Sequence, residues 1–271
     1  MIDRITQRFV LSFILLATVL GYCVPTNAGL NALYRFEDAS GEIGATIADS
    51  TSNGYNGEVL NAPIGFSTSP LPGQSGDFSG TNGIVSADLP GIGSTLGDFG
   101  IALWMKSADT AQNQIYLTDR HPVGGGNQLA VIYEYADDQI ELFAGGLGGP
   151  NPRPGSQITM ADTDWHHIVY TRTGTDYAYY LDGARTDIGT LTGDITGLVE
   201  RLNIGAARSS DSVNAFNGQL DDVAWFDNGL TDEQVGRIIV GDFSEFGVPE
   251  PSSLLLTFCG LLAIACCRKH R

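Results

Sequence analysis

The sequence predicts an all-β protein built as a sandwich of two antiparallel sheets. Short apolar runs rich in aromatic and β-branched residues recur along the chain, turn residues separate them, and 35 of the 271 residues are glycine. The clearest pair of runs lies at residues 164–183, where DWHHIVYTRTGTDYAYYLDG predicts two strands joined by a turn at Gly174. Large side chains on both faces of residues 165–173 predict a central strand, with one face in the core and the other lining a surface groove or floor.

The segments before this hairpin contain further strand signals. ALYRFED at residues 32–38 alternates well enough for a strand, and the polar, glycine-rich loop 49–57 follows it. Further strands are predicted at residues 76–80, 83–85, 99–106, 114–119, 128–135 and 139–144. Residues 145–155 are too rich in glycine and proline for the interior of a sheet and are predicted to be loop.

After the hairpin, residues 201–205 and 216–226 are predicted strands, and a short helix closes the fold. Thr231 suits the N-cap of that helix because Gln234 lies three residues later and completes a capping box. Leu230 and Val235 stand at the spacing of a hydrophobic staple, and Gly241 is expected to end the helix.

Several of these segments together resemble laminin-G-like, concanavalin A-like jelly-roll domains. The resemblance rests on YRFED at 34–38, DSTSNGYNG at 49–57, FGIALWMK at 99–106, WHHIV at 165–169 and FNGQLDDV at 216–223. It implies one jelly-roll domain at residues 29–247. It is specific for the fold and weak for function, because this fold carries lectins, adhesion modules, glycosidases and passive structural domains.

The N-terminal segment 1–28 has the features of a secretory signal peptide. Arg4 and Arg8 precede an apolar run at residues 9–20, and Thr26-Asn27-Ala28 supplies small residues before a cleavage point at Gly29. The alternative is an uncleaved membrane anchor with the same apolar helical segment.

The C-terminal segment 248–271 joins Val-Pro-Glu-Pro-Ser-Ser to an apolar run at 254–267 and to a basic end, Arg-Lys-His-Arg. Fourteen helical residues span about 21 Å, less than a hydrocarbon core of about 30 Å. This order resembles the PEP-CTERM sorting signal, which implies an exosortase-type membrane protease as a partner and transient anchoring in the inner membrane. The alternative is a plain short transmembrane anchor; either way the body is expected to be exported to the cell surface or extracellular matrix.

Charge and cysteine content limit the function classes of the body. The chain carries a formal charge of −17, and residues 29–251 alone hold nine basic and thirty acidic residues. This balance excludes nucleic acid as a partner, because phosphate binding needs clustered Lys and Arg. All four cysteines, at positions 23, 259, 266 and 267, lie in the terminal segments, so no disulfide can stabilise the body.

The resemblance also implies a structural calcium ion on the convex face, where the first and last strands of such domains lie side by side. Hard cations bind several oxygen ligands on adjoining loops. The ligands that the resemblance implies are Glu37 or Asp38, Asp49, Asn53 and Asp222. The alternative is that these are ordinary turn and loop residues. Strand alternation predicts that Asp221 and Asp222 point to opposite faces, and that His166 and His167 do the same and have structural roles.

The expected function is non-catalytic carbohydrate binding or adhesion. Glucanases of this fold carry an E-x-D-x-x-E series on one strand, and this chain has no such series, no G-x-S-x-G and no cysteine in the body. Aromatic side chains that could stack on sugar are Trp104, Trp165, Trp225, Tyr133, Tyr135, Tyr177, Tyr179 and Tyr180. Two alternatives stay open: a structural matrix protein without a specific sugar ligand, and a divergent glycoside hydrolase.

Overall fold

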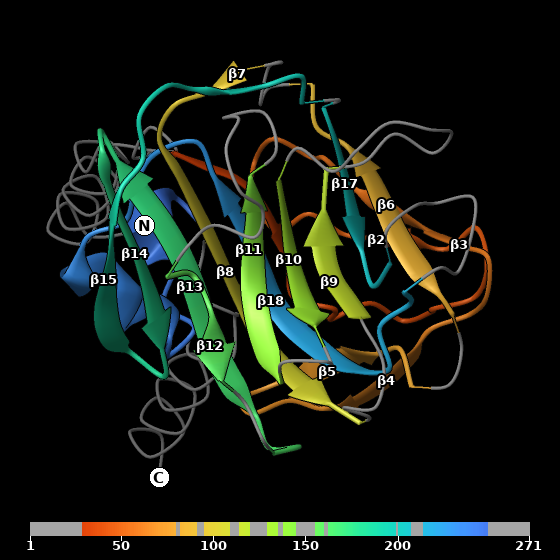
Figure 1. Ribbon diagram of the computed structural model, residues 1–271. Coiled ribbons are helices and arrows are strands. Elements are labelled where there is room, and N and C mark those ends of the chain that lie inside the picture. The colour runs from red at the N-terminus through yellow and green to blue at the C-terminus, as the bar shows by residue number, and fades with distance from the viewer. Residues whose placement is uncertain are drawn as a thin grey trace, which may run out of the picture.

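The strands of the protein form two stacked antiparallel sheets in a computed structural model (Figure 1). The structure describes residues 29–79, 82–90, 95–108, 114–119, 129–134, 138–144, 155–159, 162–198, 200–206 and 214–248. The apolar segments predicted at both termini lie outside these residues. No helix in the described part of the chain is long and apolar enough to cross a membrane.

The back sheet in Figure 1 contains eight of the described strands. Its order is β15-β14-β13-β8-β18-β5-β4, and β1 also pairs with β18. The bounds are β1 (Leu30–Tyr34), β4 (Gly65–Thr68), β5 (Gln74–Asp77), β8 (Phe99–Ser107), β13 (His166–Thr173), β14 (Asp176–Leu181), β15 (Ala184–Thr190) and β18 (Gly218–Phe226). The hairpin of β13 and β14 is confirmed, with Gly174 in the left-handed region at φ 59°.

The front sheet contains another eight described strands in the order β12-β11-β10-β9-β17-β6-β3-β2. Its bounds are β2 (Thr46–Ile47), β3 (Gly57–Leu60), β6 (Ile84–Asp88), β9 (Gln114–Thr118), β10 (Leu129–Glu134), β11 (Gln139–Ala144), β12 (Ile158–Thr159) and β17 (Arg201–Ile204). A small additional pair joins β7 (Thr95–Leu96) to β16 (Ile195–Thr196). The predicted all-β, two-sheet antiparallel sandwich is therefore confirmed.

Two departures from the predicted strands have local causes. The strand predicted at 32–38 ends at Tyr34, because Phe36 adopts φ 55°, a left-handed conformation that extended backbone does not contain. The prediction missed β15 because its sequence, ARTDIGT, is polar, and this edge strand is almost entirely exposed.

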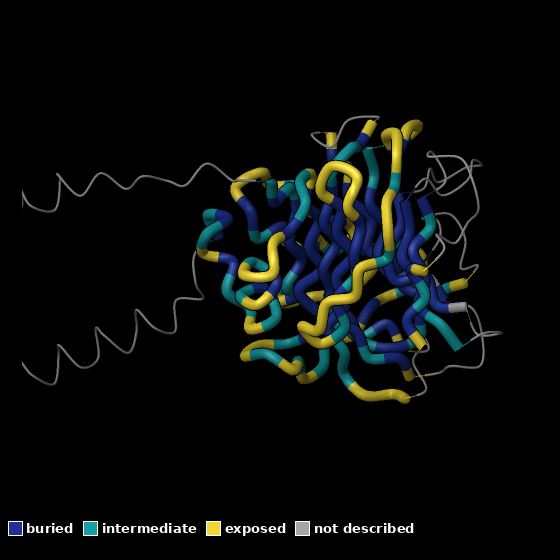
Figure 2. The backbone as a smooth tube through the Cα atoms, turned by 60° about the vertical axis from the view of Figure 1, so that its left-hand side comes forward, coloured by how far each residue is buried: buried dark blue, intermediate teal, exposed yellow. Residues whose placement is uncertain are grey.

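The main core lies between the two sheets, and Figure 2 shows the buried segments gathered in the middle of the molecule. Alternate residues of the central strands belong to this core. Buried residues from the back sheet include Tyr34, Ile101, Leu103, Tyr170 and Trp225, and those from the front sheet include Val59, Val85, Leu117, Val131, Leu142 and Leu202. This alternation leaves the other half of each strand's side chains on an outer face.

The C-terminal helix α2 (Asp232–Ile238) covers part of the outer face of the back sheet. Its capping box at Thr231 and Gln234 is present, and Val235 and Ile238 are buried in a second cluster with Val169 of β13. The short 3-10 helix η2 (Ser244–Phe246) adds Phe246 to the same cluster. The prediction that the outer face of β13 lines a surface groove was therefore wrong at Val169, because the closing helix packs there.

His167 lies on this covered face and supplies a pH-dependent contribution to stability. Its ring is fully buried 5.2 Å from the Trp104 ring, and neither ring nitrogen has a hydrogen-bond partner among the described residues. Burial lowers the pKa of His167 from 6.5 to about 4, against the opposing charge of Asp182. The folded protein therefore holds this imidazole neutral where the unfolded chain protonates it.

We expect the free energy of unfolding to lose about 2 kcal/mol from His167 between pH 7 and pH 5. The contribution is complete above pH 6.5 and is lost as the pH falls toward 4. Neighbouring His166 has the opposite slope, because Asp182 and Asp162 raise its pKa in spite of the opposing effect of burial. Urea titrations of the native chain and of His167→Gln at both pH values isolate the effect; equal pH slopes for the two proteins would contradict it.

Candidate functional site

The outer face of the front sheet carries a continuous row of side chains that do not belong to the main core. Strand pairing aligns Glu58 with Ser86, Ser86 with Asn203, Asn203 with Thr118, Thr118 with Ala130, and Ala130 with Phe143. The row therefore crosses β3, β6, β17, β9, β10 and β11 in turn. It is polar at the β3 end and apolar at the β11 end, where Ala130 and Ile132 form a small cluster with Phe143.

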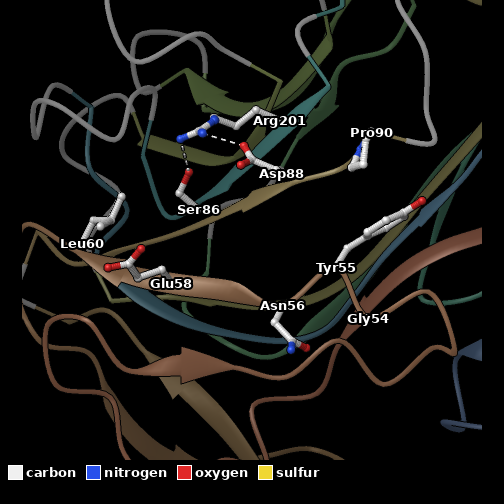
Figure 3. Close-up of a pocket in the computed structure, with 9 residues that line it drawn as sticks. All are labelled: Gly54, Tyr55, Asn56, Glu58, Leu60, Ser86, Asp88, Pro90 and Arg201. Carbon is white, nitrogen blue, oxygen red and sulfur yellow. Dashed lines mark hydrogen bonds and ion pairs between the residues drawn. The ribbon is translucent and has the colours of Figure 1, made fainter.

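A pocket of about 390 Å³ opens at the polar end of this row (Figure 3). It is lined by Gly54, Tyr55, Asn56, Glu58, Leu60, Ser86, Asp88, Pro90 and Arg201. In the view of Figure 3, Glu58, Ser86 and Arg201 lie along one side of the pocket and Tyr55 and Pro90 along the other. Strands β3, β6 and β17 supply the floor, and the loop before β3 supplies the wall that carries Tyr55.

Asp49 holds the loop that forms this wall. Its carboxylate accepts hydrogen bonds from the backbone N–H of Leu33 at 3.0 Å, of Thr51 at 2.9 Å and of Tyr55 at 2.9 Å. It also accepts one from the Thr51 hydroxyl at 2.7 Å. Asp49 is 8% exposed, so these donors have little access to water. One buried carboxylate thus fixes the position of the Tyr55 backbone against β1.

Two further contacts set the entry of this loop into β3. The Tyr34 hydroxyl donates to the Tyr55 carbonyl at 2.6 Å. A Cβ at Gly57 would lie 2.4 Å from Cγ1 of Val85, so only glycine lets the chain approach β6 this closely. The wall and the floor of the pocket are therefore positioned by the core rather than by surface contacts.

Charged and polar groups in the pocket are arranged around Arg201. Its guanidinium lies 2.5 Å from the Asp88 carboxylate and donates to the Ser86 hydroxyl at 3.4 Å. The Ser86 hydroxyl in turn donates to the Asn203 side-chain oxygen at 2.8 Å. Glu58 is exposed at the edge of the pocket. The pocket therefore offers carboxylate acceptors, guanidinium donors, a hydroxyl, an amide and an aromatic ring to one ligand.

The pocket residues were not predicted from the sequence as a binding site, although alternation in β6 could have placed Ser86 and Asp88 on one face. Strand pairing was the obstacle, because nothing in the residues indicates that β6 lies between β3 and β17.

Most of the aromatic residues that were predicted to stack on sugar are buried or only partly exposed. Trp225, Tyr133, Tyr177 and Tyr180 are at most 2% exposed, Trp104, Trp165 and Tyr179 are partly exposed, and Tyr135 lies outside the described residues.

The residues predicted to bind calcium do not form one site in the described part of the chain. Asp49 is occupied by the four donors above, and Asp38 accepts from the Ala48 backbone N–H at 3.1 Å. The Asn53 amide donates to the carbonyls of Leu30 and Asn31 at 3.4 and 2.9 Å. No group of three or more His, Cys, Asp or Glu side chains among the described residues is arranged to hold a metal ion. The five residues as a set therefore do not fit a calcium site.

Asp221 and Asp222 were predicted to point to opposite faces, and this was wrong. Leu220 and Val223 both face the main core, and Asp222 adopts φ 44° at an irregularity in the pairing of β18 with β8. This β-bulge puts both carboxylates on the same outer face. The Asp222 backbone N–H donates to Asp221 at 2.8 Å, and Ser69 also donates to Asp221.

Glu37 and Asp222 are the two predicted ligands whose charges interact. Burial raises the pKa of both Asp221 and Asp222, and the charge of Glu37 contributes to each increase. Arg35, whose Nε lies 3.4 Å from the Asp222 carboxylate, opposes the increase at Asp222. An internal guanidinium thus provides the counter-charge at this position.

Calcium binding stays a prediction of the resemblance, and a melting curve tests it. A bound ion would raise the midpoint in calcium over the midpoint in chelator by several degrees at saturating metal, since only the folded state binds it. Asp222→Asn should remove that difference if Asp222 is a ligand. Coincident curves for the native chain with and without chelator would contradict the prediction.

Comparisons with known proteins agree with the fold. A model of the concanavalin A-like lectin/glucanases superfamily, Laminin_G_3, matches residues 78–236, more than half of the chain. No curated protein matched at the level of sequence.

Among solved structures, domain 4 of AbnA, an extracellular GH43 arabinanase from Geobacillus stearothermophilus in complex with arabinotriose, aligns with a TM-score of 0.61 and 19% identity. The alignment covers 78% of this chain and 98% of that domain. The Trypanosoma rangeli sialidase aligns with a TM-score of 0.57 and 16% identity over 80% of this chain and 33% of the sialidase. The binding domain of botulinum neurotoxin DC, in complex with rat synaptotagmin II, aligns with a TM-score of 0.53 and 12% identity over 79% of this chain and 52% of that chain. At these identities the likeness shows the fold alone.

Proposed function

Because the chain belongs to the concanavalin A-like lectin/glucanase superfamily, we propose that it is a carbohydrate-binding protein whose sugar ligand enters the pocket beside Tyr55 and Glu58. The observation that carries this proposal is the composition of the pocket, which combines one aromatic ring with several hydrogen-bonding groups on the outer face of a sheet. The arabinanase domain, which the alignment covers almost completely, was solved with arabinotriose, and this supports a sugar as the class of ligand.

The chemistry of the pocket suits a polyhydroxylated ligand. Sugar hydroxyl groups both donate and accept, so neighbouring hydroxyls can donate to Glu58 and accept from Arg201 at once. Hydrogen bonds to charged groups are the stronger kind, and they would fix the orientation of the sugar ring. The Tyr55 ring adds a flat apolar surface for the C–H face of a sugar.

Binding is tested with an array of matrix and plant polysaccharides and the purified full chain. Retention on at least one glycan is expected, and Arg201→Ala should weaken it about tenfold or more, since a hydrogen bond to a charged group contributes about 1.5–3 kcal/mol. Lys106→Ala is the matched control, because Lys106 lies on β8 of the other sheet. Absence of retention on every glycan would refute the proposal.

We also propose that the protein binds sugar without cleaving it. The pocket does hold two carboxylates, and glycosidases use such a pair. A glycosidase acid, however, is usually kept protonated by shielded, apolar surroundings, whereas Glu58 is exposed and the Asp88 side chain is 72% exposed. Release of reducing ends from a bound polysaccharide, lost in Glu58→Gln, would contradict this and support a hydrolase.

We further propose that the protein is exported and acts at the cell surface or in the extracellular matrix. The supporting features are the signal-like segment 1–28 and the sorting-like tail 248–271. Mass spectrometry of the protein from its host should give a chain that starts at Gly29 and, after an exosortase-type cut, ends near Pro249-Glu250-Pro251. An intact chain in the cytosol would contradict export, and an intact tail in the membrane would favour a simple anchor.

A further inference from the structure

The pocket has an acidic imbalance that a ligand must accommodate. Two of the described lining residues, Glu58 and Asp88, are carboxylates, and Arg201 is the one cation among those residues. Arg201 lies 2.5 Å from Asp88, so its charge is largely matched within the pocket. The unbalanced negative charge of the pocket therefore lies on Glu58.

Glu58 has no ion-pair partner among the described residues, and its Cα faces Ser86, a neutral residue, across the pairing of β3 with β6. Figure 3 shows the Glu58 carboxylate on the same side of the pocket as the Ser86 hydroxyl, without an interaction between them. The carboxylate can thus accept hydrogen bonds from a ligand without first giving up an ion pair to any residue that the structure describes. A hydroxyl or a protonated amine satisfies it, whereas a ligand carboxylate or sulfate would be repelled.

The surrounding domain strengthens this preference. Residues 29–251 carry thirty acidic against nine basic residues, so an acidic polysaccharide approaches a surface of its own sign. That long-range repulsion is screened by salt, with a Debye length of about 3 Å at 1 M. A direct contact between Glu58 and the ligand is no longer than this Debye length, so salt weakens it less than it weakens the long-range repulsion.

We propose that this pocket selects sugar units that carry hydroxyl or amino groups and rejects units that carry a carboxylate or sulfate. The inference rests on the proposed function and adds the class of sugar to it. The geometry assigns the selection to Glu58, and Arg201 does not reverse it because Asp88 already balances the charge of the guanidinium, whose remaining N–H groups can still donate to a hydroxyl.

The experiment compares three probes on the purified full chain by calorimetry: a neutral glucan oligosaccharide, a chitosan oligosaccharide with free amines, and an oligogalacturonate of matched length. At least one of the first two should bind about tenfold or more tightly than the oligogalacturonate, corresponding to one charge-assisted contact. Part of this difference should persist in 1 M salt. Glu58→Gln should reduce the difference in affinity about tenfold. Glu233→Gln makes the same charge change on helix α2, which packs on the other sheet, and should leave the difference unchanged.

The possible outcomes separate the two proposals. Equal or tighter binding of the oligogalacturonate would overturn the selectivity and leave sugar binding in place. A preference that vanishes in 1 M salt, or that both variants reduce alike, would assign it to the overall charge of the domain and overturn the role of Glu58. No binding of these probes or of any glycan on the array would refute the proposed function itself.

Discussion

Replacing Asp49 by alanine is expected to destabilise the protein by about 3–5 kcal/mol and to abolish sugar binding. The carboxylate accepts four hydrogen bonds, three of them from backbone N–H groups of Leu33, Thr51 and Tyr55. Buried donors that lose their acceptor each cost about 1–3 kcal/mol, although the loop can relax and recover part of that loss. The change is large against the 5–15 kcal/mol by which a domain is typically stable.

Denaturant unfolding of Asp49→Ala and Asp49→Asn measures this effect. The asparagine variant keeps one side-chain oxygen but turns an NH₂ toward the remaining donors, so it should retain only part of the stability. Asp98→Asn is a useful control, because within the described residues the Asp98 carboxylate accepts a single hydrogen bond, from the backbone N–H of Gly174, in an exposed turn. An Asp49→Ala protein with native stability in chelator would contradict the structural role assigned to Asp49.

Replacing Tyr55 by alanine is expected to weaken sugar binding about thirtyfold, or roughly 2 kcal/mol, the usual cost of removing an aromatic anchor from an interface. Its ring lines the pocket, while its backbone is held by Asp49 and by the Tyr34 hydroxyl. Those two contacts involve backbone atoms and survive the substitution. The ring also packs against the main core, so the substitution should lower stability as well as affinity, while the backbone of the loop keeps its position.

Tyr55→Phe separates the ring from its hydroxyl. If the ring is the sugar-stacking surface, the phenylalanine variant should bind within a few-fold of the native protein. Titration calorimetry gives the affinities and thermal unfolding checks the fold of each variant. Native affinity in Tyr55→Ala would remove this pocket wall from the binding surface.

Local sequence signals predicted the fold well because they report on the immediate environment of each residue. Alternation along residues 99–106 reflects one face packed in the core and one under the C-terminal segment, as β8 has. Thr231 and Gln234 predicted the start of helix α2 because a capping box is complete within four residues.

Local sequence signals could not predict the candidate site, because the site depends on which strands lie side by side. Glu58, Ser86 and Arg201 are far apart in the chain and meet only because β6 pairs with both β3 and β17. The bulge at Asp222 had the same effect on the back sheet, where one extra residue reversed the expected direction of a side chain. Asp49 was predicted to be a calcium ligand, and an acidic residue in a polar loop has the same local pattern whether it binds a metal or caps backbone N–H groups.

A crystal structure of the protein with a bound neutral oligosaccharide tests the central claim most directly. We predict that the sugar lies on the outer face of the front sheet, with a ring against Tyr55 and hydroxyls within hydrogen-bond distance of Glu58 and Arg201. A sugar bound at the outer face of the back sheet, or crystals that stay free of sugar at saturating concentration, would contradict it.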